Sequence, residues 1–200
     1  MLTVAFATEN DRYDSEVYRA LLELLLGVPV AAWKTEIRFG GWKRVLDLAE
    51  PYLVQAADQG IRHAVLAIDN DGGLKRHPEH EPEHDPQREV EDPDGCRFCL
   101  LADALPKSWL EAGNKRCLIV PVQTLETWLL TLRGVPMNDP PEREYNRRQL
   151  KKLFFGDRHL PPEETRTTMA LEVLRREGAL TTLRERRSFR LFEEQLADWK

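Results

Sequence analysis

Two carboxylates stand one residue apart where an apolar segment of the chain ends. In RHAVLAIDNDGG, residues 62–73, the apolar run leads directly into Asp69 and Asp71. Neighbouring carboxylates repel each other, and a simple turn needs only one such residue. A divalent cation such as Mg²⁺ removes this repulsion because it binds carboxylate oxygens. We therefore predict a metal site at Asp69 and Asp71. The alternative is an ordinary turn, which the two following glycines would also suit.

Further carboxylates follow two other apolar runs. Glu9 comes directly after LTVAFAT, and Glu126 lies about one helical turn into the helix expected after KRCLIVPV. Ligands of open α/β sheets bind beyond the carboxyl ends of the strands, so these side chains can converge with the Asp pair on one cation. Two alternatives stay open. Asn10 or Asp11 could simply cap the next helix, and Glu126 could face solvent beside a buried Trp128.

A second group of residues has the ligand types of a zinc site. His80-x-x-x-His84 precedes Cys96-x-x-Cys99, and His77 competes with either histidine for a place. Such a tetrahedral site would be structural, since four protein ligands leave no open position for catalysis. The metal would supply folding energy to a polar loop that has no apolar periodicity. The alternative is an acidic loop with incidental histidines.

Basic residues gather in REYNRRQLKKLFFGDRHL, although the formal net charge of the chain is −5. A globally acidic protein can hold a polyanion on one basic face. Lys115, Lys151 and Lys152 are the candidates for contact with nucleic acid. His159 would contact phosphate or, as the favoured alternative, lie on the surface. An ordinary solvated helix face explains the basic cluster equally well.

The elements that must position these residues alternate along the first two-thirds of the chain. Apolar runs predict strands, and apolar residues at helical spacing predict helices. Pro51 marks either a kink or a restart of the second helix, and a further helix is broken or bent near Pro106. We expect strands within residues 2–8, 28–39, 61–68 and 115–122, and helices within 11–27, 41–60, 96–113, 123–134, 140–156, 161–178 and 187–199.

This alternation predicts an α/β fold, Rossmann-like, with a mainly parallel sheet flanked by helices. We expect an α/β domain over residues 1–134, with an inserted loop at 72–99 that holds the zinc site. Residues 135–200 form a small helical C-terminal region packed on that domain.

Composition narrows the class of protein further. The chain has 200 residues, of which 42% are apolar and 32% charged. The longest apolar run contains Glu23 and Pro29 and is too short to span a bilayer. The N-terminus lacks the basic start of a signal peptide, so we expect a cytoplasmic location. Three cysteines in such a chain argue against a disulfide framework, and Cys117 should be a small buried residue.

The order of these acidic motifs resembles the Toprim domain. VAFATENDRYDSEVYRALLELL resembles its first motif, with Glu9 at the acidic position, and AVLAIDNDG resembles its second, with Asp69 and Asp71 as the pair. LIVPVQTLETWLL, which contains Glu126, and SFRLFEEQL resemble later parts of small stand-alone Toprim-like proteins related to OLD nucleases. The resemblance covers residues 2–133 closely and the remainder loosely. Asn10 replaces a frequent glycine, and the insertion after Asp71 is long.

The resemblance implies phosphodiester chemistry that depends on Mg²⁺ or Mn²⁺, with nucleic acid as the ligand. Asp69 and Asp71 would bind metal, Glu9 would bind a second metal or act as general base, and Glu126 would complete the shell. Relatives of this type resemble components of bacterial phage-defence systems, which implies a partner ATPase. The alternatives are a non-catalytic Toprim-like binding module with a structural zinc, and a zinc-dependent interaction protein. The oligomeric state stays open, a dimer being one option.

Overall fold

The computed structural model describes residues 1–10, 12–70, 96–121, 124–136, 145–156 and 159–199. Within them the chain forms two compact units. Unit 1 comprises residues 1–68, 98–119 and 192–200, and unit 2 comprises residues 69–97 and 120–191. Each unit is described separately below.

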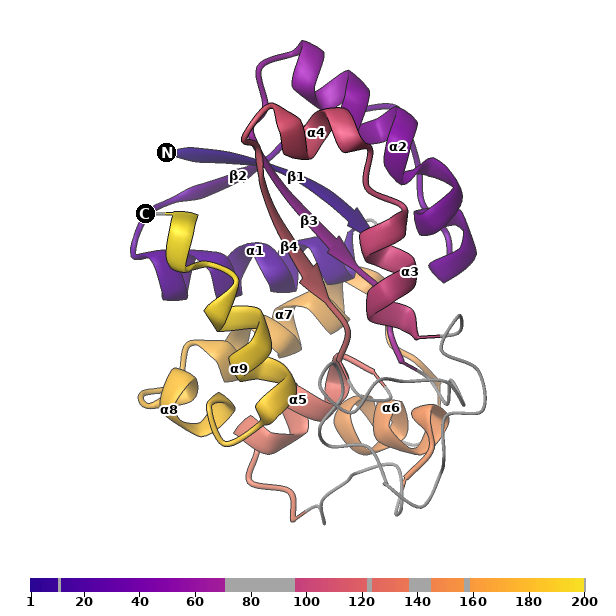
Figure 1. The fold of residues 1–200 in the computed structure, drawn as a ribbon. Helices are drawn as coiled ribbons and strands as arrows, with labels where there is room; N and C mark the ends of the chain where they lie inside the picture. Colours follow the sequence, from indigo (N-terminus) through magenta and orange to yellow (C-terminus); the bar gives the residue numbers. More distant parts are fainter. Residues whose placement is uncertain (11, 71–95, 122–123, 137–144, 157–158, 200) are drawn as a thin grey trace. The chain divides into compact units, whose positions relative to one another are not determined.

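Unit 1 is built on a parallel sheet of four strands in the order β2-β1-β3-β4 (Figure 1). The strands are β1 (Leu2–Thr8), β2 (Val30–Ala32), β3 (His63–Ala67) and β4 (Lys115–Ile119). Thr8 of β1 pairs with Ala67 of β3, which in turn pairs with Ile119 of β4. Because the strands are parallel, the carboxyl ends of these three strands lie next to one another at the same end of the sheet. The predicted α/β class and mainly parallel sheet are confirmed.

Helices connect the strands of unit 1. They are α1 (Tyr13–Leu26), α2 (Trp42–Asp58), α4 (Lys107–Glu111) and most of α3 (Arg97–Asp103). Along the strand order, the chain moves in one direction from β1 to β2 and in the opposite direction from β2 to β3. Right-handed connections therefore place α1 and α2 on opposite faces of the sheet. The strand order reverses between β1 and β3, and that switch point is where such sheets bind ligands.

Apolar spacing explains why these helices form. The buried residues of α1 include Val17, Leu21 and Leu22, which recur at helical spacing on one face. Gly27 ends α1 with a φ of 69°, a left-handed conformation that glycine adopts at low cost. The helix α2 continues through Pro51 without a restart. The predicted break near Pro106 is confirmed, because α3 and α4 are separate helices.

The open edge of β4 is covered by a side chain from the C-terminal segment. The Gln195 carboxamide donates to the Leu118 carbonyl at 2.8 Å and accepts from the Leu118 amide at 2.9 Å. It therefore replaces the backbone partner that an edge strand lacks. Cys117 is fully buried beside it, with its thiol 3.8 Å from the Phe192 carbonyl. Burial raises the pKa of the Cys117 thiol well above its ordinary value, so this residue has the predicted structural role.

Unit 2 is mainly helical. It contains α5 (Glu126–Leu132), α6 (Arg147–Phe155), α7 (Glu163–Leu174), α8 (Ala179–Leu183) and most of α9 (Arg187–Glu194); the short helix Ala197–Trp199 belongs to unit 1. Arginine side chains bind the carboxyl ends of these helices. Arg133 donates to the Phe154 carbonyl at 2.6 Å, and Arg176 donates to the Leu132 carbonyl at 3.2 Å. These bonds satisfy helix-end carbonyls that have no partner within their own helix.

One predicted boundary is wrong, and one helix was not predicted. A strand was expected within residues 28–39, but β2 spans only Val30–Ala32. Beyond it, the Trp33 amide still donates to the Val4 carbonyl of β1 at 2.8 Å, and the Trp33 and Thr35 side chains bond to Gln59 and Gln55. The helix α8 was not expected, because its five residues are too few to show an apolar period. In the described residues, no helix has both the length and the apolar character needed to cross a membrane.

Candidate active site

Asp69 lies just beyond the carboxyl end of β3 and is held there by backbone bonds on both sides. The Ile68 amide donates to the Ile119 carbonyl, and the Asn70 amide donates to the Pro121 carbonyl, each at 3.1 Å. Only 8% of Asp69 is exposed. The buried strand-end position expected of this residue is therefore present.

Within unit 2, the Asp69 carboxylate contacts a backbone amide and a guanidinium. Its Oδ1 accepts from the Leu125 amide at 3.2 Å. Its Oδ2 lies 3.4 Å from the Arg147 guanidinium, an ion pair in which the Asp69 side chain is 11% exposed and the Arg147 side chain 36%. A buried carboxylate needs such partners because removing its charge from water is costly. Asp69 is thus oriented by a main-chain donor and neutralised by a cation.

Glu126 is a second buried carboxylate in the same unit. It is 1% exposed and begins α5, rather than lying one turn into a helix as expected. Its Oε2 accepts from the hydroxyl of Thr124, which is itself fully buried. The alternative in which Glu126 faces solvent is wrong. The expectation of a buried Trp128 beside it is confirmed, since Trp128 donates to the Ser188 hydroxyl at 2.9 Å.

The two carboxylates are connected through Leu125. The amide of Leu125 binds Asp69, and Glu126 is the next residue along the chain. The two acidic side chains thus come from segments that follow neighbouring strands, β3 and β4. The structure therefore brings Asp69 and Glu126 to the same part of unit 2.

Glu9 directly follows β1, in unit 1, and is half-buried. Its carbonyl accepts from the Gly41 amide at 3.1 Å. The Asn10 side chain, just before α1, accepts from the amides of Arg12 and Tyr13. The N-cap residue of α1 is Arg12, so the expectation that Asn10 is the N-cap is wrong, although its side chain binds amides where the helix begins; Asp11 lies outside the described residues.

Several predicted ligands lie outside the described residues: Asp71, His77, His80 and His84. Cys96 is fully buried just before α3, and Cys99 is half-buried in the first turn of that helix. Both carry thiols rather than disulfides, as does Cys117. Among the residues described, no group of three or more His, Cys, Asp or Glu side chains is placed to hold a metal.

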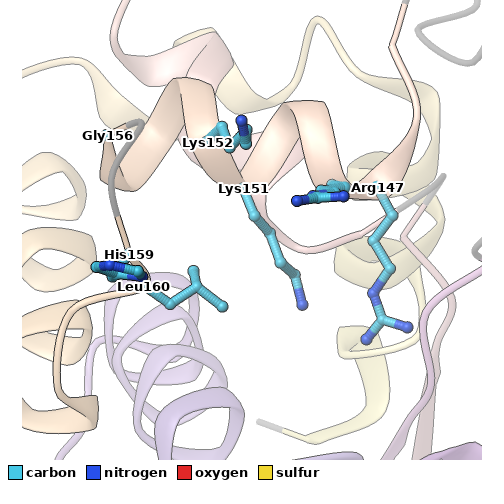
Figure 2. A pocket seen from close by; sticks show the side chains of 7 residues that line it. Arg147, Lys151, Lys152, Gly156, His159 and Leu160 are labelled. Carbon is cyan, nitrogen blue, oxygen red and sulfur yellow. The ribbon is translucent and has the colours of Figure 1, made fainter.

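The basic candidates occupy two different places. Lys115 begins β4, at the amino end of the strand, and its ammonium lies 4.0 Å from the Asp198 carboxylate. Lys151 and Lys152 are on α6, where they line a cavity of about 470 Å³ in unit 2 (Figure 2). The cavity is also lined by Arg147, Arg148, Gly156, His159 and Leu160.

Sequence reasoning missed Arg147 and Arg148. The run NRRQLKK contains them, and its density of cations was the available signal. What the run does not reveal is that Arg147 reaches Asp69, because that contact joins residues far apart in the chain. Arg147 thus belongs both to the basic cavity and to the surroundings of the acidic pair.

This arrangement suits chemistry on a phosphate group. Buried carboxylate oxygens are the ligands that hard divalent cations prefer, so the donor types of Asp69 and Glu126 fit Mg²⁺ or Mn²⁺. A guanidinium binds phosphate oxygens through paired N–H groups. No family model matches the chain, and neither the curated proteins nor the solved structures compared with it include a match.

Proposed function

We propose that the protein is a divalent-metal-dependent nuclease of Toprim type, or a related phosphodiester-processing enzyme. The observation that carries this proposal is that two carboxylates, Asp69 and Glu126, are buried in unit 2, where the amide of Leu125, the residue before Glu126, binds Asp69. Burying two acidic side chains is costly unless cations or hydrogen bonds compensate. In the chain, Asp69 follows β3 and Glu126 follows β4, and parallel sheets commonly bind ligands through residues that follow their strands.

In this proposal Asp69 and Asp71 would bind Mg²⁺ or Mn²⁺, and Glu126 would complete the shell of the cation. The cation would stabilise charge on the phosphate and activate a water molecule. The Leu125 amide keeps the Asp69 carboxylate oriented, and the Thr124 hydroxyl does the same for Glu126. By the Toprim resemblance, Glu9 would bind a second metal or act as general base on the attacking water. A structural Zn²⁺ held by His80, His84, Cys96 and Cys99 would order the insertion.

The test is cleavage of labelled single- and double-stranded DNA and of RNA in Mn²⁺ or Mg²⁺. Asp69→Asn keeps an oxygen for the Leu125 amide but removes the charge, so we expect cleavage to fall by about 10²-fold or more. Asp58→Asn is the matched control, because Asp58 is an exposed residue at the end of α2. Cleavage that persists in chelator, or that Asp69→Asn leaves intact, would refute the proposal.

A second candidate is a Toprim-like module that binds nucleic acid without cleaving it. The Asp69–Arg147 ion pair favours it, because a guanidinium already neutralises the carboxylate that a metal would otherwise bind. Binding that needs no metal, with no cleavage under any condition tested, would support this module. A partner ATPase in a defence system is a proposal for either candidate. Purifying the protein from its source with its bound partners would test it.

A further inference from the structure

The helix α6 places four cations where they destabilise the free helix. Arg147 and Lys151, and likewise Arg148 and Lys152, are four residues apart and repel each other. The two arginines also occupy the first turn, where the helix dipole favours negative charge, and that turn has no acidic residue. A bound anion would offset both effects.

These cations line a cavity large enough for a ligand. It encloses about 470 Å³, and Figure 2 shows Arg147 and Lys151 extending from α6 toward the side bordered by His159 and Leu160. Within the described ranges, no ion pair joins Arg148 or Lys151 to a carboxylate. Leu160 is 55% exposed. The cavity therefore offers cations to a phosphate and an apolar surface to a sugar or base.

The spread of the cations favours a strand over a single phosphate. Arg147 and Lys151 lie on one face of α6 and are separated by about 6 Å along the helix axis, at about 1.5 Å per residue. Phosphates of one DNA strand follow each other at about 3.4 Å along the duplex axis. The row of side chains can therefore contact two or more consecutive phosphates.

Arg147 connects this cavity with Asp69. Its guanidinium lies 3.4 Å from the Asp69 carboxylate, and the same side chain lines the cavity. We propose that the α6 cavity binds backbone phosphates of a nucleic-acid strand, and that Arg147 moves from Asp69 to the bound phosphate. That movement leaves the Asp69 carboxylate available to a divalent cation. Only this last step rests on the proposed function, because phosphate binding itself needs no metal.

The first experiment measures binding of a labelled single-stranded oligonucleotide in chelator over a range of salt concentrations. Arg148→Gln/Lys151→Gln removes two cavity cations and does not touch Asp69. Two lost phosphate contacts should weaken binding about 25-fold at about 0.1 M salt and reduce the salt slope by about 1.4. The control is Arg175→Gln/Arg187→Gln, which removes the same charge from exposed residues outside the cavity. It should change the affinity less than about twofold.

Three outcomes would overturn the strand site. The first is an equal loss of oligonucleotide affinity in both double variants, and the second is unchanged affinity in the cavity variant. The third is that inorganic phosphate or a mononucleotide, at the same concentration as the oligonucleotide, competes fully for binding. Misfolding is excluded by thermal melting, since removing like charges from α6 should not lower the melting midpoint.

The second experiment measures Mn²⁺ affinity with and without a non-cleavable phosphorothioate strand. We expect the strand to tighten Mn²⁺ binding, because binding couplings are reciprocal. Arg147→Gln should bind Mn²⁺ tightly without the strand, and Asp69→Asn should show no coupling. Strand binding without coupling would refute the Arg147 step. Coupling without cleavage would instead refute the nuclease proposal and leave the cavity proposal supported.

Discussion

Replacing Arg147 with glutamine removes the cation that faces Asp69. The two charged groups are 3.4 Å apart, and the Asp69 side chain is 11% exposed against 36% for Arg147. Near this separation the Coulomb attraction is about 4 kcal/mol at an effective dielectric constant near 20. Desolvation of Asp69 and the exposure of Arg147 reduce the net contribution to roughly 1–2 kcal/mol. We expect the free energy of unfolding to fall by that amount.

Urea denaturation of the single and double variants measures this directly. A double-mutant cycle with Asp69→Asn should give a coupling energy of about 1–2 kcal/mol between the two side chains. Arg148→Gln is the matched control, because Arg148 is on the same turn of α6 and makes no ion pair with Asp69 in the described structure. Its coupling to Asp69 should be small.

Metal adds a second readout to the same variant. With Arg147 removed, the Asp69 carboxylate has lost its cation, so Mn²⁺ should stabilise the variant more than it stabilises the parent protein. A coupling energy below about 0.3 kcal/mol would mean that water already screens the pair. That result, or equal stabilisation of both proteins by Mn²⁺, would refute the reasoning.

Three further predictions concern stability. Gln195→Ala leaves both backbone groups of Leu118 without their side-chain partner and should cost about 1–3 kcal/mol in urea denaturation; a loss below about 0.5 kcal/mol would mean that water replaces the carboxamide. Burial and the nearby Lys115 charge lower the pKa of His63, so the unfolded chain binds more protons there. This contribution to stability is complete above about pH 6.5 and is lost as the pH falls toward the pKa of His63 in the folded protein. His63→Gln should flatten that part of the profile of stability against pH. An unchanged profile would contradict the assignment. Asn146→Ala removes the capping box of α6 and should lower stability by about 1 kcal/mol, measured by thermal melting, whereas Asn146→Asp should largely retain it.

Much of the fold follows from local pattern. The strand β1 matches its predicted range of residues 2–8, and α1 ends at the glycine expected to stop it. Such elements are predictable because their apolar spacing is contained in a short stretch of chain. The edge strand β2 was overestimated because the residues after Ala32 look like a strand locally, yet their side chains bond to α2. Pairing at a sheet edge depends on neighbours that local pattern does not specify.

The candidate site shows the same difference between what local pattern predicts and what tertiary contacts determine. By itself, the sequence determined that acidic residues follow three apolar runs and that cations cluster in NRRQLKK. Tertiary structure decided that Glu126 is buried, that Leu125 presents its amide to Asp69, and that Arg147 serves both Asp69 and the cavity. These contacts join segments distant in the chain, and they form only once packing has placed the helices of unit 2. Residue types near strand ends can be read locally, whereas the partner of each charge is set by the folded arrangement.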